Sequence, residues 1–164
     1  MQLNSKLNRK LDQILNNNLS KIIADSEEVL ISSKSIKSVK AGNISIETSD
    51  FQILFELFEQ PHHWGRTNLE IDVQPNEVFR SSLGINEISE IRFYFNNPMF
   101  RFSKTKYLLQ VEIITNNLSL SIGQYYFDNN QFNFLYTGEM AITTNIILCA
   151  ENCADYYRLE NLKN

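Results

Sequence analysis

Several residue types that enzymes rely on are scarce in this chain of 164 residues, which has five glycines, three prolines, two cysteines and two histidines. No two glycines have the spacing of a Walker or Rossmann loop, whose backbone holds a nucleotide phosphate. No Gly-x-Ser-x-Gly sequence marks a nucleophilic serine. These absences argue against nucleotide-cofactor and serine-based enzymology. We therefore predict no bound cofactor and assign no catalytic or metal-ligating residue.

The two cysteines are Cys149 and Cys153, four residues apart in a segment whose pattern predicts a helix. Side chains at this spacing share a helix face but are poorly disposed for an unstrained disulfide. A disulfide framework is thereby excluded, which is typical of a reducing compartment. The N-terminus lacks the pattern of a signal peptide, and the apolar run 146–150 is too short to cross a bilayer. We expect a soluble cytoplasmic protein without a membrane span.

The net charge of −4 and the isoelectric point near 5.2 provide no general attraction for nucleic acid. Arginine, lysine and aromatic residues do alternate in the segments 92–95 and 100–107, as they do on sheets that bind single strands. Strand alternation, however, places Phe93 and Phe95 on the face opposite to Arg92 and Tyr94. The phenylalanines then belong to a core, so nucleic acid is not the predicted partner.

The length suits a single domain over residues 1–164, and the pattern predicts an α+β fold. Apolar residues at helical spacing predict amphipathic helices over about 3–24 and 140–162. Between them, short apolar alternations separated by polar turns predict an antiparallel meander sheet of five or more strands. These strands include Leu69–Val73 and several segments between Ile91 and Tyr136. The two helices are expected to flank the sheet.

Two segments between the helices are less uniform. Residues 50–59 have apolar side chains at i, i+3, i+4 and i+7, which favours a helix. The alternation of Phe51, Ile53, Phe55 and Leu57 leaves a strand as the alternative. Residues 76–83, which precede Gly84, predict a short helix.

Both histidines and the single tryptophan fall within Pro61–Arg66. Histidine titrates near neutral pH and binds metals, and tryptophan often anchors a protein contact. Glu70 and Asp72 follow on the polar face of the next predicted strand. The side chains of neighbouring histidines diverge on a strand, so a metal site here would need loop geometry and a third ligand. The spacing also matches no known metal-site pattern. The candidate binding residues are His62, His63, Trp64, Arg66, Glu70 and Asp72.

These observations predict a non-enzymatic soluble binding or accessory protein that acts through a protein partner, as an adaptor, assembly factor or inhibitor does. One alternative is a carrier of a small hydrophobic ligand between sheet and helices, near the aromatic residues of 125–136. Another is an enzyme or metal site that uses His62 or His63 with Glu70 or Asp72. The leucine stripe of the N-terminal helix also offers a surface for a homo-oligomer.

Overall fold

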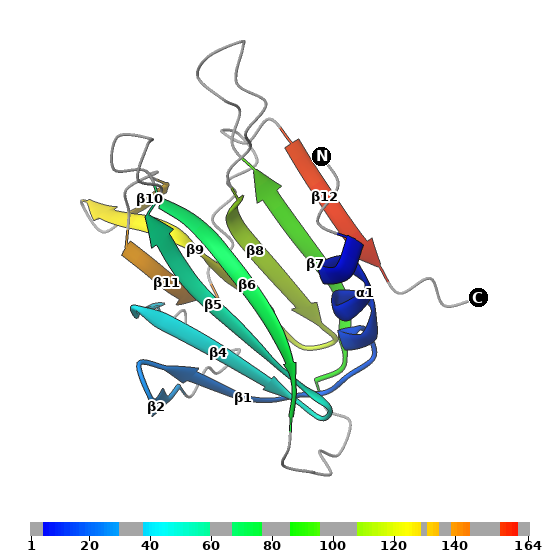
Figure 1. Ribbon diagram of the computed structural model, residues 1–164. Coiled ribbons are helices and arrows are strands. Elements are labelled where there is room, and N and C mark those ends of the chain that lie inside the picture. The colour runs from blue at the N-terminus through cyan, green and yellow to red at the C-terminus, as the bar shows by residue number, and fades with distance from the viewer. Residues whose placement is uncertain are drawn as a thin grey trace.

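The computed structural model describes residues 5–29, 38–59, 67–76, 86–95, 108–128, 131–134, 139–144 and 155–160. These residues form one short helix and twelve strands in two antiparallel sheets. In Figure 1 the five-stranded sheet lies in front of the seven-stranded sheet, with the helix at one side. The predicted antiparallel sheet is therefore confirmed, although the two long flanking helices are not.

The five-stranded sheet has the order β2-β1-β4-β5-β6. Its strands are β1 (Leu19–Ala24), β2 (Glu27–Glu28), β4 (Asn43–Thr48), β5 (Phe51–Glu59) and β6 (Thr67–Pro75). The seven-stranded sheet has the order β12-β7-β8-β9-β11-β3, and β10 pairs with β9 beside this path. Its strands are β3 (Ser38–Lys40), β7 (Ile88–Phe95), β8 (Leu108–Thr115), β9 (Ser119–Asp128), β10 (Gln131–Phe134), β11 (Glu139–Thr143) and β12 (Asp155–Glu160).

A core of buried apolar side chains joins α1 (Ser5–Ile14) to both sheets. Alternate residues of each strand point toward this core because side chains alternate between the two faces of a sheet. The five-stranded sheet contributes Ile44, Ile46, Ile53, Phe55, Leu69 and Val73; the seven-stranded sheet contributes Ile91, Phe93, Val111, Ile113, Leu120 and Ile122. We call the opposite face of each sheet its outer face.

The helix predicted over 3–24 ends at Ile14, and residues 19–24 form β1 instead. Asn16 has a φ of 72°, a left-handed conformation that asparagine tolerates and that commonly ends helices. The Asn17 side chain donates to the Gln13 carbonyl at 2.7 Å and accepts from the Asp50 amide at 3.1 Å. The asparagine run therefore turns the chain out of the helix and joins it to the β4–β5 turn.

The leucine stripe expected to offer an oligomer surface is used inside the chain. Leu11, Ile14 and Leu15 are buried in the core, and Leu7 packs against it. The other predicted flanking helix is wrong over both of its described parts. Residues 139–143 form β11 between β9 and β3, and residues 155–160 form β12 beside β7. Cys149 and Cys153 lie outside the described residues.

Residues 51–59 form the strand β5, so the alternative interpretation of the segment 50–59 was the correct one. Ile53 and Phe55 point into the core, while Leu54 and Glu56 lie on the outer face. The short helix predicted over 76–83 lies outside the described residues apart from Asn76. Among the described residues, no helix is both long enough and apolar enough to cross a membrane.

Candidate functional site

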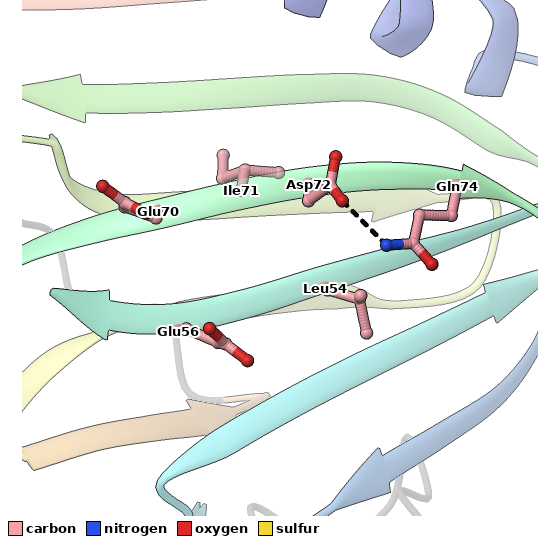
Figure 2. Close-up of a pocket in the computed structure, with 6 residues that line it drawn as sticks. All are labelled: Leu54, Glu56, Glu70, Ile71, Asp72 and Gln74. Atoms are coloured by element: carbon pink, nitrogen blue, oxygen red, sulfur yellow. Dashed lines mark hydrogen bonds between the residues drawn. The ribbon is translucent and has the colours of Figure 1, made fainter.

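The outer face of β5 and β6 holds the two described members of the predicted site, Glu70 and Asp72. Both point away from the core because their neighbours Leu69, Ile71 and Val73 point the other way. The register places Glu56 of β5 directly opposite Glu70. Leu54 and Gln52 lie opposite Asp72 and Gln74 in the same way. Figure 2 shows Glu56 on β5 and Glu70, Asp72 and Gln74 on β6.

A hollow of about 240 Å³ lies over these strands. Its lining consists of Leu54, Glu56, Glu70, Ile71, Asp72 and Gln74. Sites that enclose a small organic ligand measure roughly 300–1,000 Å³ and are mostly apolar. This smaller and acidic hollow therefore suits a contact with side chains of another molecule better than the enclosure of a hydrophobic ligand.

Glu56 and Glu70 form a cross-strand pair of like charge, and both are exposed. Among the described residues, no ion pair or hydrogen bond neutralises either carboxylate. Like charges directly opposite each other on a sheet are destabilising. The pair therefore leaves negative charge available on this face.

Asp72 differs from this pair because its carboxylate is held from several sides. Gln74 donates to it from Nε2 at 2.8 Å, and the Val73 amide donates at 2.9 Å. Lys10 of α1 lies 3.6 Å away. The hydrogen bond from Gln74 lowers the pKa of Asp72; partial burial opposes this shift, and the charge of Lys10 adds to it. Asp72 thus stays ionised at neutral pH in a fixed orientation.

Phe58 lies at the far end of the same outer face and is 49% exposed. Its register partner is Asn68, two positions before Glu70. It is the exposed large hydrophobic side chain of the described residues. An apolar ring beside an acidic surface is a common anchor in protein interfaces.

The other predicted site residues, His62, His63, Trp64 and Arg66, lie outside the described residues. Their place relative to Glu70 and Asp72 stays a prediction. Within the described part of the chain, no three histidine, cysteine or acidic side chains are grouped to hold a metal ion.

A second polar cluster lies on the outer face of the seven-stranded sheet. Arg92 of β7 pairs with Glu90 on its own strand and with Glu112 of β8, whose Oε2 is 3.4 Å from Nη1. The Tyr94 hydroxyl donates to the same Oε2 at 3.0 Å. The Ser119 hydroxyl donates to Oε1 at 2.7 Å. Each oxygen of Glu112 therefore has at least one donor.

Burial and the negative charge of Glu112 raise the pKa of Tyr94 to about 12, so its phenol stays protonated and keeps donating. The Glu112 side chain is 4% exposed. A buried carboxylate needs such donors, since an unpaired buried charge is costly. Arg92, which lies in the first of the two segments where basic and aromatic residues alternate, thus neutralises carboxylates within the chain. The other segment, 100–107, lies outside the described residues.

The sequence pattern missed Leu54, Glu56 and Phe58 as members of the site. A helix over 50–59 separates these residues from the strand that contains Glu70. The alternation of Phe51, Ile53 and Phe55 was the signal that places them on one strand face. An antiparallel hairpin of β5 and β6 then brings Glu56 opposite Glu70.

No protein-family model, curated protein or solved structure matches the chain.

Proposed function

We propose that this protein is a non-enzymatic binding or accessory protein that docks on a protein partner through the outer face of β5 and β6. The observation that carries the proposal is the exposed Glu56–Glu70 pair, which has no counter-charge among the described residues. A basic group of a partner converts this repulsion into attraction. The partner surface is therefore basic.

Three neighbouring features support docking on this face. The Asp72 carboxylate is fixed by Gln74 and Lys10, so part of the acidic surface is ordered before a partner arrives. The exposed ring of Phe58 and the half-buried Leu54 add apolar area. Interfaces usually combine an apolar anchor with a polar rim, and complementary charge speeds association.

Site-specific photo-crosslinking tests the location of the interface. A benzoylphenylalanine placed at Phe58 or Leu54 should crosslink a partner in a lysate of the cells that make the protein. The same group at Asp12, which is exposed on α1, is the control and should not crosslink that partner. Equal crosslinking from Asp12 would place the interface elsewhere.

Charge reversal tests the acidic pair. The double variant Glu56→Lys with Glu70→Lys should weaken binding of the crosslinked partner at least tenfold. Asp12→Lys with Glu27→Lys is a matched control, because it changes the net charge equally at two other exposed positions. Equal weakening in both variants would indicate a general charge effect and contradict a docking site on β5 and β6.

A further inference from the structure

β6 ends the five-stranded sheet, and one of its edges has no strand partner among the described residues. It has nine residues, whereas the other strands with a single partner, β2, β3, β10 and β12, have two, three, four and six. Proteins usually keep edge strands short or block them, because an open edge can pair with another chain. Among the described strands, β6 therefore presents the longest unpaired edge at the end of a sheet.

The hydrogen bonds show which residues of β6 point toward this edge. The Asn76 amide donates to the Asp50 carbonyl of the β4–β5 turn at 2.8 Å, so the even-numbered residues bond toward β5. The backbone of Val73 points the other way: its amide donates to Asp72 and its carbonyl accepts from Lys10. Antiparallel pairing alternates these directions. The amides and carbonyls of Leu69 and Ile71 therefore also point toward the edge.

The edge is blocked at one end and open in its middle. At Val73, Lys10 and Asp72 occupy the carbonyl and the amide at 2.7 and 2.9 Å. Pro75, the next residue whose backbone faces this edge, has no amide hydrogen to donate. In contrast, no bond to the outward groups of Leu69 or Ile71 is present within the described part of the chain. An added strand therefore fits beside Leu69 and Ile71 and ends before Val73.

We propose that the partner adds an extended segment to β6 as an antiparallel strand beside Leu69 and Ile71, with basic residues at every second position. This inference rests on the proposed function and names the form of the partner. Neighbouring strands lie about 4.8 Å apart, so alternate side chains of the added strand come within reach of Glu70 and Asp72. The intervening side chains lie beside Leu69 and Ile71 and are apolar. Main-chain bonds supply affinity and the charges select the segment.

A synthetic peptide of alternating lysine and valine, capped at both ends, is the probe. Nuclear magnetic resonance of the labelled protein should show the amides of Leu69 and Ile71 shifting on addition of the peptide. Their hydrogen exchange should slow at least tenfold. The Val73 amide, which already bonds to Asp72, should change less. A peptide of alternating glutamate and valine is the charge control and should not bind.

Methylation of the peptide backbone separates strand addition from contact by side chains alone. In an antiparallel pair, bonded residues that face each other have side chains on the same sheet face. The valine amides of the peptide therefore point at β6, and the lysine amides point away. Methylating the valine nitrogens should abolish binding, whereas methylating the lysine nitrogens should leave it within about twofold.

Two results would overturn the inference without touching the proposed function. Equal binding of both methylated peptides would show docking by side chains alone. Failure of the lysine–valine peptide to bind, while Phe58 still crosslinks a partner, would show a partner of another form. The variant Ile71→Pro gives a check from the protein side, because it removes an outward amide and no bond to β5. It should weaken peptide binding at least tenfold while urea unfolding stays cooperative.

Discussion

The outer faces of the two sheets hold similar charged residues in opposite circumstances. On the seven-stranded sheet, Glu112 is buried and accepts bonds from Arg92, Tyr94 and Ser119. On the five-stranded sheet, Glu56 and Glu70 are exposed and oppose each other. The first arrangement neutralises its charge within the chain, whereas the second has no counter-charge among the described residues. Pairing and burial, rather than residue type, separate the two.

The largest expected effect is from removal of Arg92. Arg92→Met leaves Glu90 and Glu112 without their cation, and losing one partner of a buried pair costs about 3–5 kcal/mol. Because the Arg92 side chain is 29% exposed, we expect the free energy of unfolding measured with urea to fall by about 3 kcal/mol, the lower end of this range. Lys10→Met is the control, since the exposed Lys10–Asp72 pair should contribute less than about 1 kcal/mol. Equal losses would remove the distinction between the faces.

Replacing glutamate by glutamine should change the free energy of unfolding in opposite directions on the two outer faces. Glu112→Gln replaces a carboxylate that three donors stabilise, and we expect a loss of about 2 kcal/mol in urea unfolding. Glu70→Gln removes a repulsion with Glu56 and should raise stability by up to about 0.5 kcal/mol. If Glu70→Gln destabilised the fold as much as Glu112→Gln, Glu70 would have a structural role.

Tyr94 should make the free energy of unfolding vary with pH in the alkaline range. Its folded pKa of about 12 exceeds the ordinary value of 10.0, so the unfolded chain loses this proton first. The contribution of Tyr94 is therefore complete below about pH 10 and is lost as the pH rises toward 12. Tyr94→Phe should cost about 1.5 kcal/mol at neutral pH and flatten this alkaline decline. Absorbance of tyrosinate during titration, with unfolding at each pH, provides the measurement.

The smallest expected effect concerns Asp72. Its pKa lies below the ordinary 3.8, so its contribution is present above that value and decreases as the pH falls through the lowered pKa. Asp72→Asn should remove this acid-range dependence and change neutral stability little, because the carboxylate is exposed. Thermal unfolding of both proteins from neutral to acid pH tests this expectation. A large neutral loss in the variant would contradict it.

The sheet was more predictable from sequence than the helices. The strict alternation of Leu69, Ile71 and Val73 with polar residues predicts a strand, because a strand with one buried face has apolar side chains at every second position. In contrast, the apolar residues of 19–24 fit a helix and a strand alike. Asn16 and Asn17 decide between them through a left-handed turn and side-chain bonds to distant segments. At the other end, pairing of residues 139–143 with both β9 and β3 outweighs their helical spacing.

Part of the candidate site could be predicted from the sequence, because some of its residues follow from local alternation and others from the pairing of distant strands. The alternation of Glu70 and Asp72 with apolar residues places both on a polar face. The position of Glu56 opposite Glu70 depends on the register between β5 and β6, which local alternation does not show. Likewise, the sequence places Arg92 on the face opposite to Phe93 but does not show its partner. Its carboxylate partner Glu112 lies on the next strand, where the register places it directly opposite.

The position of β3 has a consequence for folding during synthesis. The five-stranded sheet uses residues from 19 to 75, but β3, which lies between β2 and β4 in sequence, leaves it to pair with β11. In that pairing Lys40 meets Ala141. All five strands of the five-stranded sheet are therefore synthesised before β7. We expect the seven-stranded sheet to form later, because its β3–β11 pair joins segments that are far apart in the sequence and such contacts form slowly.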